Sequence, residues 1–584
     1  MGGFLLLTKD PDCSGEETES RHRGALDVFR KKQLKVRKRI VRQRFVLLAY
    51  GKHAFAHQDH YEFDNGDFIV SVGTGLYRGQ AGPPALKAVH ESFSRQQLRP
   101  DDLLGSYGIV LLRGDRLFVF NDYTGLYRIY CNRERSVLSS SFLAVVKTLP
   151  ERNLSGQEFY EYLFHETSYG DKTLLKEVEL LDSTRTWQIS PQIGSQPKEV
   201  VPGPLPGSTM DDRIARVSEN LSGYFRILRD VFGDDVISSL SGGYDTRLLL
   251  ALARNAGIRP RLFVYGPEDS GDVRVARAIA EGEGLELEHI DKSRFPRVPP
   301  DAFGEVVERN YYLFDGLGST GVFDNGSDAA TRIKRARQAR LHLNGGGGEI
   351  YRGVWHVPDG RVSLEKFLNY RYGPVHIVED FVDYSVCGDR FDRREFTAAL
   401  GEKMKAALGV SRDWVTRREM MELYPFIRHK YWLSMNHSLD NQFSYALTPF
   451  AELRFVMESF SIPAEEKSHG RFEAALIRTL DERLAGYPSV YGFNFVDRAP
   501  WPGRAMKSMR QNLPYVLRPL IPFVRRKMQA RRYRPPFYLR GDYLEEIFAG
   551  RDLQVRRYVD LEKVTDANML SRILSVELLL RDSF

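Results

Sequence analysis

The segment SGGYDT at residues 241–246 contains the residue types of a phosphate-binding loop. Its two glycines let the backbone approach an oxyanion with the amide groups pointing inward, and the hydroxyls of Ser241 and Thr246 can donate hydrogen bonds. Asp245 would repel a phosphate, so its expected role is to hold Mg²⁺, which bridges phosphate oxygens. The segment differs from a Walker motif, because the sequence contains neither GxxxxGKS nor GxxxxGKT.

The surrounding pattern predicts that a strand and a helix position this segment. Residues 234–240 form a short apolar run, and residues 246–257 have the periodicity of an amphipathic helix that ends at glycine. Further strands are predicted at 261–266 and 285–290, with a helix at 271–284 between them. Strands that alternate with helices predict a parallel sheet, whose ligands bind beyond the carboxyl ends of the strands.

The N-terminal part of the chain reads differently, as short β-rich runs separated by turn residues, for example at 45–51, 67–75 and 107–122. This pattern predicts mostly antiparallel strands. The fold class is therefore α/β with two domains, and the proline- and glycine-rich stretch 202–208 predicts the linker between them. The predicted boundaries are an antiparallel domain at 1–200 with a basic segment near 20–44, a parallel-sheet nucleotide-binding domain with extra helices at 201–490, and a basic C-terminal extension at 491–584.

The composition of the 584 residues restricts the class of protein. No apolar run reaches the roughly 18 residues of a membrane-spanning helix. The start MGGFLLLTKD has no basic residue before its apolar stretch, so it is a poor secretory signal. Three scattered cysteines, Cys13, Cys131 and Cys387, argue against a disulfide framework and fit a reducing compartment. We therefore expect a cytoplasmic protein.

The net charge of +7 is mild for this length, so we expect no nucleic acid partner. Lysine and arginine are concentrated in segments 20–44 and 501–540. Such segments form either a solvated surface or a contact with an anionic surface, such as the face of a membrane. The sequence leaves self-association open.

The SGGYDT segment resembles the fingerprint of the ATP-pyrophosphatase fold group, whose members cleave ATP between the α- and β-phosphates. Within that group the chain resembles the asparagine synthetase family, because LNGGGGEIYRG at 343–353 is similar to the family's second loop, SGEGADEVFGG. Segments 107–131, 434–452 and 462–478 are similar to family segments in the same order. The resemblance implies an antiparallel αββα, Ntn-hydrolase-like glutaminase domain followed by a synthetase domain.

The resemblance also implies ATP and Mg²⁺ as cofactors and assigns roles to residues of this sequence. Asp245 and Glu349 would hold the metal ion, and Lys467 or Arg471 would neutralise charge on the α-phosphate and pyrophosphate. Asp272 lies where the family has an acidic residue, and a helix N-cap is its structural alternative. The residues expected to contact ATP are Leu240, Ser241, Gly242, Gly243, Asp245, Thr246, Val264, Gly266, Asn344, Gly345 and Gly347.

Three departures from the family pattern change the expected chemistry. Glutamine-hydrolysing members use an N-terminal cysteine as the nucleophile, whereas Gly2 has no side chain and Cys13 is not at a terminus. The family's NGE is replaced by residues 73–75, Gly-Thr-Gly. We therefore expect a degenerate glutaminase, as in lasso-peptide cyclases and β-lactam synthetases. Gly346 replaces a family glutamate near the acceptor site, which argues against L-aspartate as the substrate.

The sequence thus predicts a carbon–nitrogen ligase that adenylates a carboxylate, releases pyrophosphate, and passes the acyl group to an amine or ammonia with release of AMP. The carboxylate can belong to a peptide (a macrocyclase), to a sugar uronate of surface-polysaccharide synthesis, or to a small molecule such as aspartate. Glu422 and Tyr424 could supply an acid/base pair or merely end a helix before Pro425. A tRNA-modifying ATP-pyrophosphatase and a non-catalytic relative are the remaining alternatives.

Overall fold

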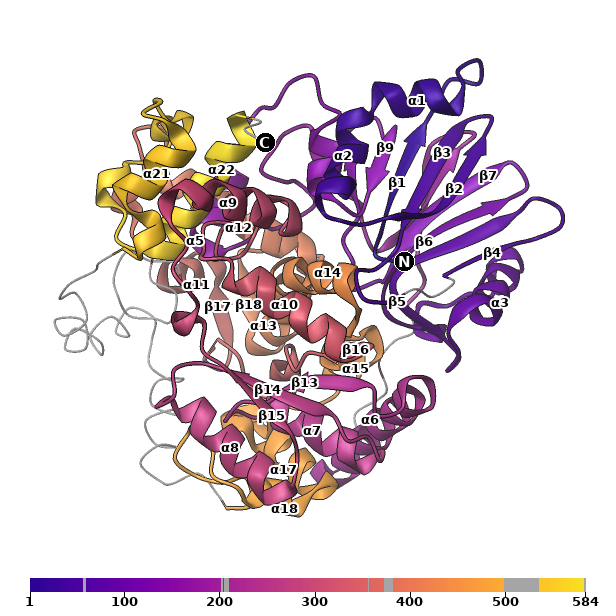
Figure 1. The fold of residues 1–584 in the computed structure, drawn as a ribbon. Coiled ribbons are helices and arrows are strands. Elements are labelled where there is room, and N and C mark those ends of the chain that lie inside the picture. Colours follow the sequence, from indigo (N-terminus) through magenta and orange to yellow (C-terminus); the bar gives the residue numbers. More distant parts are fainter. Residues whose placement is uncertain are drawn as a thin grey trace.

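The computed structural model describes residues 1–55, 59–200, 203, 209–355, 357–371, 382–497 and 535–581. Two antiparallel sheets form the N-terminal part, and a parallel sheet follows later in the chain (Figure 1). At this level the predicted fold class is confirmed. Most of the predicted linker at 202–208, and most of the basic segment 501–540, lie outside the described residues.

The N-terminal part contains two six-stranded sheets. In order across the first sheet, the strands are β10 (Val178–Leu180), β8 (Tyr130–Asn132), β9 (Val137–Ser139), β1 (Gly3–Thr8), β3 (Phe45–Tyr50) and β2 (Val36–Arg42). In order across the second sheet, they are β12 (Gly194–Pro197), β11 (Arg185–Ser190), β7 (Arg116–Asn121), β6 (Leu103–Arg113), β5 (Phe68–Tyr77) and β4 (His60–Glu62).

The two sheets pack face to face between layers of helices. Alternate side chains of β1 show this, because Phe4 and Leu6 belong to the core between the sheets, whereas Leu5 and Leu7 pack against helices. Both faces of such strands are buried, which is why they read as continuous apolar runs in the sequence. The covering helices are α2 (Arg23–Lys31), α4 (Phe142–Val146) and α5 (Gly156–His165) on the first sheet, and α3 (Gly82–Ser94) on the second.

The basic segment 20–44 is part of this layered structure. It runs from the end of α1 (Gly15–Arg21) through α2 to the edge strand β2. Helix α2 buries Val28 and Phe29, and the buried Lys32 pairs with Asp315 at 2.8 Å. Charged side chains on β2 protect an exposed sheet edge from pairing with other chains. The basic residues of segment 20–44 therefore lie on helices and a strand whose apolar residues belong to the core.

The parallel sheet has five strands, and every neighbouring pair is parallel. Strands β13, β14 and β15 confirm the three predicted in this region. All carboxyl ends meet at one edge, where ligands of such sheets bind. In order across the sheet, the strands are β15 (Leu287–Ile290), β14 (Arg261–Tyr265), β13 (Val236–Ser239), β16 (Leu341–Leu343) and β19 (Tyr445–Leu447).

Helices cover both faces of the parallel sheet. One face packs against α6 (Met210–Phe232), α7 (Asp245–Asn255) and α17 (Arg471–Leu480), and α8 (Gly271–Glu283) extends the same layer. On the other face, Arg335 of α10 (Ser327–Gln338) stacks over Phe263 of β14 with 4.6 Å to the ring centroid. Helix α10 leads directly into β16, so its position determines where the loop after β16 lies.

Further helices follow β16. The small pair β17 (Arg361–Ser363) and β18 (Trp414–Thr416) is antiparallel. The helices around it are α11 (Leu364–Arg371), α12 (Arg393–Leu408) and α13 (Arg417–Tyr424), which continues into a π-helical segment at Pro425–Leu433. Next come α14 (Ser434–Phe443), α15 (Leu453–Ser459), α16 (Ala464–Lys467) and α18 (Glu482–Gly486).

The C-terminal residues pack back onto the body of the protein. Helices α21 (Gly541–Phe548) and α22 (Ala567–Arg581), yellow in Figure 1, lie beside α5 and α9 (Pro300–Leu313). Ile573 and Leu578 share one core with Phe159 and Val307, so these C-terminal helices are integrated into the fold. Within the described ranges, no helix combines the length and apolarity needed to cross a membrane.

Candidate active site

The segment 241–246 forms the turn between β13 and α7, as predicted. Side-chain oxygens accept the hydrogen bonds of its amide groups. The amide of Ser241 donates to Thr246 Oγ1 at 2.9 Å, the amide of Gly242 donates to Asp272 Oδ1 at 2.8 Å, and the amide of Gly243 donates to Ser241 Oγ at 3.3 Å. These acceptors occupy the positions that phosphate oxygens would take at such a turn.

Asp272 therefore contacts the loop directly. The N-cap of α8 is Ser270, whose hydroxyl accepts from the amide of Val273. The N-cap alternative for Asp272 is thus wrong, and its carboxylate is an acceptor for the first glycine loop.

The second glycine segment follows β16 and packs against the first. A Cβ atom placed on Gly345 would lie 3.1–3.2 Å from the backbone and side chain of Thr246, and one on Gly348 would lie 2.7 Å from Asp245 Cγ. Side chains at these positions would push the loops apart. Asn344 fixes the loop by accepting the amide hydrogen bond of Gly346 at 2.8 Å. The glycines therefore serve close loop-to-loop approach.

The two loops border a cavity of about 300 Å³ at the carboxyl edge of the sheet. It is large enough for several phosphate groups or part of a nucleotide. The lining residues are Ser241, Gly243, Tyr244, Asp245, Thr246, Asp272, Asn344, Gly345, Gly346, Arg352, Val490 and Tyr491. Six residues predicted to contact ATP are among them: Ser241, Gly243, Asp245, Thr246, Asn344 and Gly345.

Other predicted residues lie behind this lining. Leu240 and Val264 are buried in one apolar cluster, and Gly266 receives a hydrogen bond from the His289 ring at 2.8 Å. Gly242 is covered by the chain at Val490, whose amide donates to the Gly242 carbonyl at 3.2 Å. Gly347 packs against the ring of His429. These residues shape the loops without facing the cavity.

Three carboxylates converge on one guanidinium beside the cavity. Arg352 approaches Asp245 with both Nη atoms, at 2.7 Å to Oδ1 and 3.0 Å to Oδ2. It also lies 3.3 Å from Glu349 Oε1 and 3.2 Å from Glu473 Oε2. Sequence analysis predicted Asp245 and Glu349 but missed Arg352 and Glu473. The sequence feature that could have identified them is that they lie in segments 343–353 and 462–478, which resemble family segments.

Burial controls the charge of this cluster. Burial, followed by repulsion from Glu349, raises the pKa of Asp245 to about 6. Burial and the neighbouring Asp245 raise the pKa of Glu473 far above its ordinary value, so Glu473 is the partner that keeps a proton. Burial opposes the charge of Arg352, yet the surrounding carboxylates hold its pKa above the ordinary range. One guanidinium thus faces Asp245, Glu349 and a protonated Glu473.

The carboxylates also decide whether Mg²⁺ fits here. Within the described part of the chain, no group of three or more His, Cys, Asp or Glu is arranged to hold a metal ion. Nucleotide-bound Mg²⁺, however, usually needs only one or two carboxylates, because phosphate and water supply the other ligands. Asp245 Oδ1 is buried, and its 2.7 Å contact with Arg352 Nη1 is an ion pair without hydrogen-bond geometry. Asp245 and Glu349 therefore fit Mg²⁺ that arrives with ATP.

The predicted basic residues differ in their surroundings. Lys467 is buried, and burial lowers its pKa to about 7, opposed by the nearby Glu422 carboxylate. Arg471 is exposed at the first residue of α17. Neither lines the cavity. Glu422 pairs with Arg418 at 2.8 Å. The half-buried Tyr424 lies in the electrostatic field of Glu349 and Asp245.

A segment after α18 crosses the first glycine loop. Arg247 of α7 donates hydrogen bonds to the carbonyls of Tyr487 at 2.8 Å and Pro488 at 2.6 Å. Tyr244 stacks on Phe495 with 4.1 Å between ring centroids. These contacts hold Tyr491, whose side chain is half exposed, at the rim of the cavity. Nothing in the sequence pattern predicted this rim, because its partners are about 240 residues apart.

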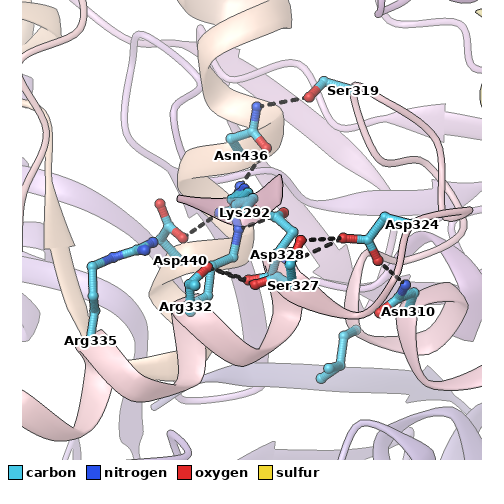
Figure 2. A network of polar contacts seen from close by, with 12 residues as sticks. Lys292, Asn310, Ser319, Asp324, Ser327, Asp328, Arg332, Arg335, Asn436 and Asp440 are labelled. Carbon is cyan, nitrogen blue, oxygen red and sulfur yellow. Dashed lines mark hydrogen bonds and ion pairs between the residues drawn. The ribbon is translucent and has the colours of Figure 1, made fainter. Parts of the chain in front are cut away.

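A polar network fixes the elements that carry the second loop (Figure 2). Arg332 of α10 donates to Asp440 Oδ1 at 2.5 Å and to Asn436 Oδ1 at 3.1 Å, both on α14. Asp328 accepts from Arg332 at 3.1 Å and from Lys292 at 2.5 Å. Because α10 leads into β16 and α14 leads into β19, the network holds two neighbouring strands of the sheet in place.

Glycine stands at positions 2 and 73, where the family that the sequence resembles has glutaminase residues, and leaves little room there for a side chain. Residues 73–75 also border a second cavity, of about 290 Å³. A Cβ atom on Gly2 would lie 2.8 Å from the Gly51 carbonyl oxygen, and one on Gly73, where φ is +82°, would overlap the Ser106 carbonyl. Thr74 donates to Asn441 Oδ1 of α14 at 2.7 Å. Thr74 thus joins the antiparallel strand β5 to helix α14.

No protein-family model and no curated protein matches the sequence. Three solved structures illustrate how distant the structural similarities are. The allosteric regulatory enzyme of purine biosynthesis gives a TM-score of 0.23 at 8% identity, covering 50% of this chain and 80% of that one. Glutamine phosphoribosylpyrophosphate amidotransferase from B. subtilis, complexed with ADP and GMP, gives 0.23 at 9% identity, covering 49% and 65%. A U34-tRNA thiolase from Methanococcus maripaludis gives 0.18 at 13% identity, covering 56% and 81%. Scores this low carry no inference about fold or activity.

Proposed function

We propose that this protein is an ATP-dependent ligase that activates a substrate carboxylate as an acyl-adenylate and joins it to an amine or to ammonia. The observation that carries the proposal is the pair of glycine loops after the adjacent parallel strands β13 and β16, which border one cavity and bring Asp245 and Glu349 to the same guanidinium. A cavity at the carboxyl edge of a parallel sheet, with amides and a helix start beside it, suits phosphate groups.

In the first step, the substrate carboxylate attacks the α-phosphate and pyrophosphate leaves. Ser241 and Thr246 present hydroxyls, and the start of α7 adds its positive dipole end to stabilise negative charge. Mg²⁺ held by Asp245 and Glu349 would supply further charge neutralisation when it arrives with ATP. Lys467 or Arg471 would neutralise the leaving pyrophosphate, and the buried Lys467 is the candidate whose charge responds to ligand binding.

In the second step, a nitrogen nucleophile attacks the acyl-adenylate and AMP leaves, which mainly requires correct positioning. Gly2 and residues 73–75 support a nucleophile that does not come from glutamine hydrolysis in this chain. The nitrogen is then a substrate amine or free ammonia. A peptide carboxylate and a sugar uronate are the leading acceptor classes, and asparagine synthesis ranks below them because Gly346 replaces the expected glutamate.

ATP–pyrophosphate exchange tests the first step. Wild-type protein with Mg²⁺ should exchange pyrophosphate in the presence of one class among aspartate, uronic-acid sugars and short carboxyl-bearing peptides. Asp245→Asn should lower the exchange rate at least about 100-fold, on the scale of losing a key electrostatic contact. Asp230→Asn, at an exposed position on α6, is the matched control and should exchange normally. Formation of ADP, or full exchange by the Asp245 variant, would contradict the proposal.

A further inference from the structure

Arg352 contacts residues that lie far from it in the sequence. It follows the second glycine segment, yet its guanidinium reaches back to the first loop and sideways to α17. Its side chain is 19% exposed and lines the cavity. Three described carboxylates from three elements share this one cation, which holds both loops to α17 while no nucleotide is present.

The oxygens that Arg352 contacts are those that Mg²⁺ needs. The guanidinium approaches both oxygens of Asp245 and one oxygen of Glu349. Mg²⁺ and the guanidinium compete for these oxygens, because two cations side by side repel each other and draw on the same lone pairs. We therefore expect Mg²⁺ bound there to displace Arg352 from Asp245 and Glu349.

The contact with Glu473 can hold Arg352 at the cavity while its guanidinium changes partners. Glu473 is fully buried on α17 and lies 3.2 Å from Nη1. It is less accessible to a metal ion than the loop carboxylates, which are 18% and 28% exposed. A guanidinium that keeps its contact with Glu473 and releases Asp245 remains at the wall of the cavity. Phosphate oxygens are its natural new partners, because the guanidinium fork pairs with them through two hydrogen bonds.

We propose that Arg352 is an exchangeable internal cation, which holds Asp245 and Glu349 in the nucleotide-free protein and moves onto phosphate oxygens when Mg·ATP binds. The inference rests on the proposed function, because it requires that Mg·ATP occupies this cavity. Arg352 then acts twice. It competes with free metal for the carboxylates, and it adds a direct phosphate contact that the metal-loaded site needs.

The two roles give opposite signs for one substitution. Arg352→Met removes the competing cation, so Mn²⁺ without nucleotide should bind about tenfold or more tightly, since a charge-assisted contact is worth at least that factor. The same variant loses the phosphate contact, so Mg·ATP should bind about tenfold or more weakly. Arg352→Lys keeps a charge without the fork and should fall between. Arg478→Met, at an exposed position of α17, removes an equal charge and should change neither affinity.

Mn²⁺ binding is measured by electron paramagnetic resonance, and Mg·ATP binding by calorimetry, on the full chain. Far-ultraviolet circular dichroism checks folding, and Arg352→Gln replaces the methionine variant if that one unfolds. Unchanged or weaker Mn²⁺ binding by the folded variant would overturn the competition, and unchanged Mg·ATP binding would overturn the phosphate contact. Wild-type pyrophosphate exchange alongside either result would leave the proposed function standing. Wild-type protein that binds neither Mn²⁺ nor Mg·ATP would overturn both.

Discussion

Glu452 makes the stability of this protein depend on pH in a direction that can be measured. It lies just before α15, is 6% exposed, and accepts hydrogen bonds from the Gly105 amide at 3.0 Å and the Tyr224 hydroxyl at 2.9 Å. Gly105 belongs to the antiparallel part and Tyr224 to α6, so Glu452 joins the two halves of the molecule. Burial raises its pKa from the ordinary 4.5 to about 7, although both hydrogen bonds oppose the shift.

The sign and size of the effect follow from linkage. Between pH 4.5 and 7 the folded protein binds a proton at Glu452 that the unfolded chain has lost, so the free energy of unfolding falls as pH rises. The whole shift corresponds to roughly 3 kcal/mol, most of it lost between pH 5 and pH 8. Glu452→Gln cannot ionise and can still accept from Gly105. The variant should therefore gain stability relative to wild type as pH rises through this window.

Denaturant unfolding at pH 5, 6, 7 and 8 measures the difference between wild type and Glu452→Gln, in which the contributions of the other titrating groups cancel. The difference should change by about 2–3 kcal/mol from pH 5 to pH 8. Glu482→Gln, at an exposed position in the first turn of α18, should run parallel to wild type throughout. Parallel curves for Glu452→Gln as well would refute the burial argument.

Two further predictions concern the cavity. A Cβ atom on Gly242 would overlap the Val490 side chain, so Gly242→Ala should weaken Mg·ATP binding about tenfold. Adding Val490→Gly should restore much of the lost affinity, as measured by calorimetry. A double variant that binds as weakly as the single one would contradict this steric explanation. Burial lowers the pKa of Lys467 to about 7, so its charge is lost as pH rises from 6 to 8 and the affinity for Mg·ATP should fall. Lys467→Met should bind Mg·ATP weakly at every pH. If the affinity of that variant still falls with pH as steeply as in wild type, Lys467 is not the titrating group.

Local patterns in the sequence were enough to predict the framework of the site. The strand, turn and helix around residues 234–257 appear as predicted, because a short apolar run, two glycines and an amphipathic repeat each determine local backbone conformation. The alternation of strands and helices was enough for the parallel sheet. The continuous apolar runs of the N-terminal part predicted strands, but only the packing of Leu5 and Phe4 on opposite faces shows the layers.

The electrostatic part of the site could not be predicted in this way. The contacts of Arg352 with Asp245 and Glu473 join residues 107 and 121 positions apart. A single sequence predicts neither pair, because it does not show which distant charged residues meet in the fold, and most charged residues are solvated. Arg471 shows the reverse situation, since its place in segment 462–478 suggested a site role, whereas its side chain is exposed and does not line the cavity. Burial separates the two cases, and burial is a tertiary property.

The chain pairs the charged groups of this site with one another. The carboxylate of Asp272 accepts the amide of Gly242, where a phosphate oxygen could stand, and Arg352 pairs with Asp245 and Glu349, where a metal ion could stand. An anion and a cation of the chain thus take the two parts that Mg·ATP would supply. Binding of Mg·ATP would then replace contacts within the chain by contacts with the ligand. Only the difference in free energy between the two sets of contacts appears as affinity. Arg352 also stabilises the fold, because carboxyl groups gathered around the fully buried Glu473 would be costly without a cation beside them.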